Sequence, residues 1–395
     1  MQTGPDVLRD TDWTRTFHAY GSGADAPQRL APLLTGDPGE RGRALDYLYG
    51  AILHQGTVYS ATVPAALFVA GILDSPALDA PAAKPSGGGE PTPLRNILLG
   101  FLADAAEGAL YCAVPEAQAP PEPTAAELDR VYAALDSDDD EAVEVWEGPV
   151  MEALLYRVGP DMRAAAPVLY EAVHPHLTHA DPGTRMRAVE AAAAAARLGG
   201  LDLDLSGAAD MAESRDEGAV IVLALGQVGG DTAEFLTHAD PAIRACAALA
   251  PSQAGNPAAT DELAAALADP AGADTWFGTR PAFFPGRVRF TLARVLAERA
   301  APSDAERLLP VLRAMVPLSS THVGAGDVGQ LLRVAFPSDG KAAVDADLTG
   351  VQRAYLAALL DNNALWEGGV ANFRVHLKGL GLPEDRGGIS ALAGV

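Results

Sequence analysis

Apolar residues in this chain recur at the spacing of a helix rather than that of a strand. After Arg185, the residues Met186, Val189, Ala193 and Ala196 follow one another at intervals of three and four, which places them on one face of a helix. Two of these four residues are alanine, whose small side chain lets neighbouring helices approach closely. No alternating strand pattern or hairpin signal is evident. The pattern predicts an all-α fold.

Gly and Pro punctuate the boundaries of these periodic segments. The spacing predicts helices over 26–34, 41–54, 61–73, 94–110, 124–135, 161–173, 184–198, 216–227, 241–250, 258–268, 287–299, 303–315, 350–361 and 384–393.

One short motif, Asp-Pro-x-x-Arg, opens three of the helical segments. Its copies are Asp37 with Arg41, Asp181 with Arg185, and Asp240 with Arg244. An aspartate at the N-cap accepts hydrogen bonds from the free N–H groups of the first turn, and proline suits the first helical position. We expect each arginine to reach its own cap aspartate or that of the next repeat. The motif therefore predicts repeated, capped helix starts.

Two of these copies are preceded by histidine, so that the letters His-Ala-Asp-Pro occur twice, at His179 and at His238. A His two residues before an Asp could belong to a metal or proton-relay site. The third copy has Thr35 at the same place, and a metal needs three or four convergent ligands. We therefore interpret both histidines as turn residues.

The repeated motif resembles the turn and second-helix start of the HEAT-repeat superfamily. Two end segments, 19–73 (beginning AYGSGADAPQRL) and 348–383 (beginning LTGVQRAYLAALL), are similar to a group of actinobacterial HEAT-repeat proteins. The resemblance implies an α-α superhelix, a HEAT-like helical-repeat solenoid whose second helices line a concave face. It implies a binding scaffold rather than a particular activity.

On this basis, residues 1–395 are expected to form a single solenoid. Pro- and Gly-rich stretches predict loops at 77–93 and 115–124. The region 270–350 departs from the repeat pattern, as does 200–235, and the repeat register stays open in both.

Net charge narrows the classes of partner. The chain has 52 acidic and 28 basic residues, a net charge of −24. This balance opposes binding to nucleic acid and to anionic membranes, and favours a basic protein partner. No signal peptide or membrane span is evident, so a cytoplasmic protein is expected. Cys112 and Cys246 lie far apart among apolar neighbours, which favours buried free thiols over a disulfide.

The stretch 54–62, HQGTVYSAT, is a candidate partner-binding site. Its His54 and Tyr59 could face a groove near the amino-terminal end, and Thr57 could cap the helix that follows. The alternative, which we favour, is a buried polar turn that fixes the crossing of two helices.

A second candidate is the aromatic and arginine-rich stretch 274–290. Tyrosine, tryptophan and arginine are enriched at interface hot spots, and this chain is otherwise poor in aromatics. A loop whose aromatics fill a gap in the solenoid is an equal alternative. The candidate partner-binding residues here are Trp276, Phe277, Arg280, Phe283 and Phe284.

The acidic run 136–147 resembles a calcium-binding loop in its spacing of carboxylates. However, Glu141 stands where the sharp turn of such a loop demands glycine. A solvated acidic patch, useful against a basic partner, is the favoured interpretation, and cation binding stays open.

No Walker loop, nucleophile elbow, dinucleotide-binding fingerprint or zinc-protease motif is evident. We therefore expect no catalytic residue, cofactor or metal, and a non-enzymatic scaffold or adaptor with an acidic concave face, of regulatory or immunity type. The alternative is a ligand-binding or lyase-type enzyme built on the same solenoid. The sequence leaves the oligomeric state and the identity of the partner open.

Overall fold

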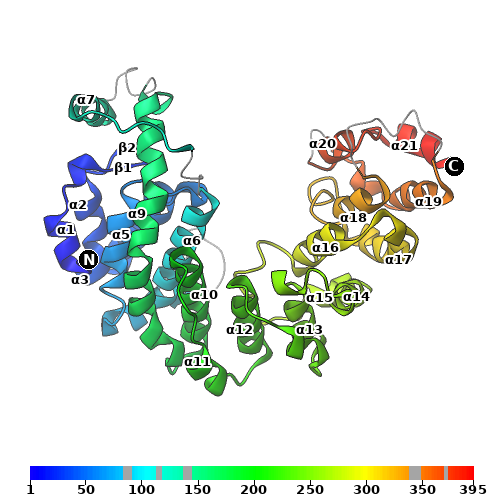
Figure 1. Ribbon diagram of the computed structural model, residues 1–395, viewed down its shortest axis with the longest axis horizontal. Coiled ribbons are helices and arrows are strands. Elements are labelled where there is room, and N and C mark those ends of the chain that lie inside the picture. Colours follow the sequence, from blue (N-terminus) through cyan, green and yellow to red (C-terminus); the bar gives the residue numbers. More distant parts are fainter. Residues whose placement is uncertain (83–90, 113–117, 137–144, 338–347, 369–371) are drawn as a thin grey trace. The chain divides into compact units, whose positions relative to one another are not determined.

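The computed structural model describes residues 1–82, 91–112, 118–136, 145–337, 348–368 and 372–395 (Figure 1). Helices make up nearly all of its regular structure, so the predicted all-α class is confirmed. The chain divides into two compact units, unit 1 (Met1–Ala212) and unit 2 (Glu213–Val395). The prediction of one continuous solenoid concerns how these units join and stays a prediction. No described helix is both long and apolar enough to cross a bilayer.

The described α-helices of unit 1 are α1 (Pro5–Asp10), α2 (Ala26–Leu30), α3 (Pro32–Thr35), α4 (Pro38–Tyr47), α5 (Thr62–Ala70), α6 (Leu94–Tyr111), α7 (Ala125–Leu135), α9 (Pro149–Val173), α10 (Pro182–Gly199) and α11 (Ser206–Met211). Single turns of tighter or wider helix join them: η1 (Trp13–Arg15), the π-helical η2 (Leu48–Ile52), η3 (His54–Gly56), η4 (Pro76–Asp79) and η6 (His174–Thr178).

Helix α10 packs against both α6 and α9 in unit 1 (Figure 1). Its run of alanines from Ala191 to Ala196 is fully buried, because small side chains let the three helix backbones come close. A close approach also occurs between α6 and η3, where a Cβ on Gly108 would lie 2.4 Å from the carbonyl oxygen of Gly56. Only glycine fits at that contact.

The longest helix, α9, begins at Pro149, twelve residues before the predicted start at 161. Pro160 and Pro167 lie inside it, although proline normally ends a helix by removing an N–H and crowding the preceding turn. Both prolines lie on the exposed side of the helix, so water can reach the carbonyl groups that lose their partners. The predicted boundary was wrong for this reason.

Two short antiparallel ladders also correct the prediction that the chain contains no strands. β1 (Phe17–His18) pairs with β2 (Gly21–Ser22), and β3 (Pro81–Ala82) pairs with β4 (Thr92–Pro93). Two residues are too few to show an alternating pattern, so these strands leave no periodic signal in the sequence. The second ladder lies inside the stretch 77–93 that was predicted to be a loop.

The described α-helices of unit 2 are α12 (Arg215–Gln227), α13 (Pro241–Ala248), α14 (Pro257–Ala266), α15 (Pro270–Ala273), α16 (Val288–Arg299), α17 (Ala305–Met315), α18 (Val328–Ala335), α19 (Gly350–Leu359), α20 (Asn372–Gly379) and α21 (Arg386–Ala393). Its single turns are η7 (Ala233–Thr237), η8 (Pro251–Gln253), η9 (Pro302–Asp304), η10 (Val316–Leu318) and η12 (Asn363–Leu365). Around one hydrophobic core, α12 packs on α13, α13 on α14, α14 on α16, α16 on α18, α17 on α19 and α19 on α21.

A buried ion network braces the part of unit 2 between residues 274 and 327. The Arg289 guanidinium pairs with Asp274 and, at 3.3 Å, with Asp327, whose side chain is completely buried. Ser319 Oγ donates a further hydrogen bond to Asp327 at 2.6 Å. Burial raises the pKa of Asp327, and these hydrogen bonds and the arginine oppose the rise. The predicted irregular region 270–350 therefore contains helices joined by polar bracing.

Candidate functional site

The two His-Ala-Asp-Pro turns have the same hydrogen-bonded geometry. Nδ1 of His179 accepts a hydrogen bond from the backbone N–H of Asp181 at 3.0 Å, and His238 does the same for Asp240 at 3.0 Å. The imidazole thus takes the part that an Asn or Asp side chain plays in an Asx turn. Asp181 and Asp240 then cap α10 and α13, as the motif predicts.

The third copy of the turn explains why it lacks histidine. Glu40, at the third helical position of α4, accepts from the backbone N–H of Asp37 at 3.0 Å, while Asp37 accepts from Glu40 N at 2.8 Å. This capping box satisfies the N–H group that the histidine satisfies elsewhere. The other two copies have Thr184 and Ile243 at that position, which do not supply such an acceptor. The structure therefore places His179 and His238 in a turn-forming role.

The arginines of the motif do not reach a cap aspartate, contrary to expectation. Arg185 Nη1 donates to the two carbonyl oxygens just before its cap residue at 2.8 and 3.1 Å, and Arg244 Nη1 does so at 2.9 and 3.2 Å. The cap carboxylates have other partners: Asp181 accepts from Thr184 N, and Asp240 accepts from Ala242 N and pairs with Arg215 at 2.6 Å. Arg41 differs again, donating to the carbonyl of Ala77 at 3.3 Å.

The stretch 54–62 is divided between the core and the surface. Tyr59 is buried, and its ring lies edge-on to Phe17 and Trp146, with centroids 6.2 and 6.4 Å away. These rings, with residues of α7 and α9, form a small separate core in unit 1. Tyr59 therefore fills the interior, as the favoured alternative for this stretch expected.

Thr57 does not cap the next helix. Helix α5 begins at Thr62, whose Oγ1 accepts from Tyr59 N at 2.8 Å and donates to the carbonyl of Ile52 at 2.6 Å. The chain uses four more residues, 58–61, than a cap at Thr57 would need to turn from η3 into α5. The cap prediction was wrong because Thr62 is held within the interior turn.

His54 lies near the surface, beside an exposed tyrosine that sequence reasoning missed. Its Nδ1 lies 2.9 Å from the carbonyl oxygen of Gly50 and 3.2 Å from the Tyr20 hydroxyl. A carbonyl only accepts, so Nδ1 carries the proton and Nε2 keeps its lone pair. The adjoining backbone is unusual: η2 is a π-turn, and Gln55 adopts a left-handed conformation with φ of +52°.

The same surface contains a carboxylate that several groups share. The Tyr47 hydroxyl donates to Asp25 Oδ1 at 2.7 Å, Arg29 Nε lies 3.2 Å from Oδ2, and His18 Nε2 lies 3.6 Å from Oδ1. Burial lowers the pKa of His18, and Asp25 opposes this shift. Nδ1 of His18 accepts from Tyr20 N at 3.1 Å.

We call His18, Tyr20, Asp25, Tyr47 and His54 the amino-terminal cluster. Adjacent rings along it lie edge-on or nearly so, with centroids 5.3 to 6.4 Å apart. Tyr20 is 69 % exposed, so its ring is open to a partner. Exposed aromatic faces beside a carboxylate suit contact with a cation. Only His54 had a signal in the sequence, because His18, Tyr20 and Asp25 match no motif and Tyr47 comes from another segment.

The aromatic stretch of unit 2 is largely incorporated into the core. Phe284 is only 2 % exposed, Phe277 stacks on it with centroids 5.8 Å apart, and Trp276 and Phe283 are partly buried against the same core. Arg280 is exposed and extends from the loop. The structure brings these aromatics together as a plug, the second of the two alternatives, and leaves Arg280 as the one outward group of the candidate set.

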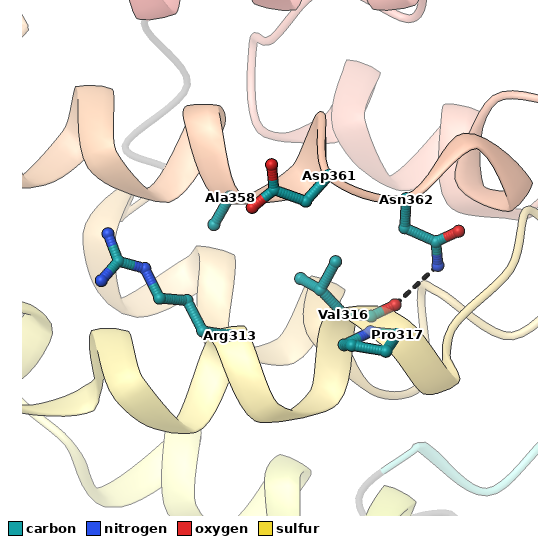
Figure 2. Close-up of a pocket in the computed structure, with 6 residues that line it drawn as sticks. All are labelled: Arg313, Val316, Pro317, Ala358, Asp361 and Asn362. Carbon is teal, nitrogen blue, oxygen red and sulfur yellow. Dashed lines mark hydrogen bonds between the residues drawn. The ribbon is translucent and has the colours of Figure 1, made fainter.

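A pocket of about 370 Å3 opens between α17 with η10 and the end of α19 (Figure 2). Val316, Pro317 and Ala358 supply its apolar lining, and Arg313 and Asp361 lie on opposite walls. Both charged residues are exposed, and no ion pair joins them in the described part of unit 2. No sequence motif marks this pocket, because its two walls are almost fifty residues apart in the chain.

The sequence also raised the acidic run 136–147, a metal site and the two cysteines. Most of the acidic run 136–147 lies outside the described residues. Within the described ones, no group of three or more His, Cys, Asp and Glu side chains is arranged to hold a metal ion. Cys246 is buried, and burial raises its pKa, but Cys112 is exposed after the last residue of α6, which corrects the expectation of two buried thiols.

Comparison with known proteins identifies no family for this chain. No family model, curated protein or solved structure matches it. The resemblance to HEAT-repeat proteins therefore stays a prediction, and function has to be argued from the chemistry of the molecule.

Proposed function

We propose that this protein is a non-catalytic binding scaffold for a basic polypeptide, which docks mainly on unit 1. The observation that carries the proposal is the uneven distribution of charge. Unit 1 has 31 acidic and 13 basic residues, a net of −18, whereas unit 2 has 21 acidic and 15 basic residues, a net of −6. A field of one sign over a surface draws in partners of the opposite sign.

The arginines of unit 1 are too few to neutralise its carboxylates, and most of them already form ion pairs within the unit. Many arginines of unit 1 are already paired with its own carboxylates: Arg9, Arg15, Arg29, Arg95, Arg157, Arg187 and Arg197. The surplus acids, among them Asp46, Glu171 and Asp202, are exposed to solvent. A basic partner supplies the counter-charge that the unit lacks.

The amino-terminal cluster provides an anchor for such a partner. The exposed Tyr20 ring can receive a lysine or arginine side chain by a cation–π contact, with the Asp25 carboxylate nearby. The lone pair of His54 Nε2 can accept a hydrogen bond from the same cation. The proposal also includes a HEAT-like superhelix formed by the helices of both units. It places the scaffold in the cytoplasm.

The test uses the full chain and a fluorescein-labelled 20-residue peptide of mixed Lys, Arg and Leu, with an acidic peptide of equal length as control. Anisotropy titrations from low to high salt should show binding of the basic peptide only, weakening as salt rises. Absence of binding at low salt would overturn the proposal.

Matched variants distinguish docking on unit 1 from a response to total charge. One set is Asp46→Asn, Glu171→Gln and Asp202→Asn combined, and the other is Glu234→Gln, Glu306→Gln and Glu367→Gln combined. The first set should weaken binding about tenfold and the second much less, since each exposed pair contributes about 0.2–1 kcal/mol. Equal losses would contradict docking on unit 1.

Tyr20→Ala tests the anchor, with Tyr111→Ala as its control, because Tyr111 is also exposed but lies at the end of α6. Loss of a cation–π contact should weaken binding roughly threefold to tenfold for Tyr20 alone. An equal effect of the two substitutions would remove the amino-terminal cluster from the proposal.

A further inference from the structure

We propose that the pocket between α17 and α19 binds a free aliphatic amino acid, or a closely similar zwitterion. The two charged residues on its walls carry the inference. Arg313 and Asp361 border the same hollow from opposite sides, and their charged groups are not paired with each other (Figure 2). A ligand with one carboxylate and one ammonium group can pair with both at once.

The chemistry of each wall assigns one end of the ligand. The planar guanidinium of Arg313 matches a carboxylate and can bind it through two parallel hydrogen bonds. The Asp361 carboxylate accepts hydrogen bonds from an ammonium group. A ligand of a single charge would pair with one wall and bring a like charge towards the other, which disfavours simple anions and simple cations.

The walls of the pocket are held in place before any ligand arrives. Asn362 Nδ2 donates to the carbonyl oxygens of Val316 at 2.6 Å and Ser319 at 3.0 Å, while its Oδ1 accepts from Ala364 N at 2.9 Å. This amide ties η10 to the end of α19, so its own polar atoms are already engaged. A preformed site loses little conformational entropy when a ligand binds.

The apolar lining selects the side chain of the ligand. Val316 and Ala358 are buried beneath the hollow and Pro317 forms part of its rim. The volume of about 370 Å3 lies at the lower end of the roughly 300–1,000 Å3 that small-molecule pockets span. An amino acid with a branched aliphatic side chain, such as leucine, has the size, polarity and charge that this lining fits.

The experiment titrates the full chain with L-leucine by calorimetry, and in parallel with leucinamide, which lacks the carboxylate, and N-acetyl-leucine, which lacks the ammonium group. Leucine should bind, and each analogue should bind at least about tenfold more weakly because one charge-assisted hydrogen-bonded contact is lost.

Two variants that replace a charged side chain by an amide test which wall causes each loss of affinity. Arg313→Gln should weaken leucine binding about tenfold and abolish the preference for leucine over leucinamide. Asp361→Asn should also weaken leucine binding about tenfold, and it should abolish the preference for leucine over N-acetyl-leucine. Arg333→Gln and Glu306→Gln change the same charges at exposed positions away from the pocket lining and should leave affinity unchanged.

Failure of leucine to bind at millimolar concentration, or equal binding of leucine and its two analogues, would overturn the proposal. Losses that are the same in the pocket variants and in the control variants would also overturn it. Binding of the basic peptide to unit 1 should be unaffected by Arg313→Gln and Asp361→Asn, so the two proposals fail separately.

Discussion

The His-Ala-Asp-Pro turn of unit 1 and that of unit 2 have equivalent internal hydrogen bonds but different surroundings. Arg185 is only 6 % exposed and also donates to the carbonyl of Met211 at 3.4 Å, whereas Arg244 is half-buried and pairs with Glu262 at 2.8 Å. Nε2 of His179 lies 3.3 Å from Arg95, whereas His238 is exposed. The two turns therefore have similar geometry, but burial and neighbouring side chains should make their contributions to stability differ.

The largest expected difference concerns the two arginines. Arg185→Ala should lower the free energy of unfolding by about 3 kcal/mol, because it removes the hydrogen bonds that a buried guanidinium donates to three backbone carbonyl groups. Arg244→Ala should cost about 1 kcal/mol, because water reaches the carbonyl groups that it exposes. Urea unfolding of both variants, with hydrogen exchange at α10 and α13, measures the difference. Equal costs would show that burial does not distinguish the two turns.

A smaller difference is expected for the histidines. His179→Ala should cost about 1 kcal/mol and His238→Ala less than about 0.5 kcal/mol, since each loses one hydrogen bond acceptor and only the first is partly buried. Asn in place of either histidine can form an Asx turn and should restore most of the loss. Thermal unfolding of the Ala and Asn variants tests this, and a failure of Asn to restore stability would argue against the turn-forming role.

The third copy of the turn allows the histidine to be replaced by design. Glu40→Ala should remove the capping box and cost about 1 kcal/mol. Adding Thr35→His should recover part of that loss, because the new imidazole can accept from the N–H of Asp37 as its counterparts do. Chemical unfolding of the single and double variants measures the recovery. If the double variant is no more stable than Glu40→Ala, the two acceptors are not interchangeable.

The smallest expected effect is a pH dependence of stability around His176 in unit 1. His176 is buried, and burial followed by the charge of Arg95 lowers its pKa, while Asp74 opposes the shift. A histidine with a lowered pKa binds fewer protons when folded, so its contribution to stability is lost as the pH falls through the unfolded value of about 6.5. Hydrogen exchange at pH 7.5 and 5.5 should show α10 losing protection before α13, and His176→Gln should reduce that difference. Equal loss at both helices, or no change in His176→Gln, would contradict the assignment.

Much of the local structure was predictable because it depends on bonds between residues close in the chain. The predicted helix 94–110 matches α6 (Leu94–Tyr111), and the aspartates of the motif cap α4, α10 and α13. The errors arise where a distant contact changes the local preference. α9 tolerates Pro160 and Pro167 because they face solvent, and Thr62 is drawn inward to Ile52 instead of leaving Thr57 to start the helix.

Packing decided the candidate sites. Tyr59 and Phe284 both lie in stretches that the sequence marks as candidate binding sites, but both are buried, while Tyr20 had no motif and is exposed. Arg313 and Asp361 border the same pocket only because α17 and α19 pack side by side. Cap and turn hydrogen bonds close over three to six residues and are written in the local sequence. Pockets and exposed clusters join residues far apart in the chain, so only the packing of helices decides which side chains meet and which face solvent.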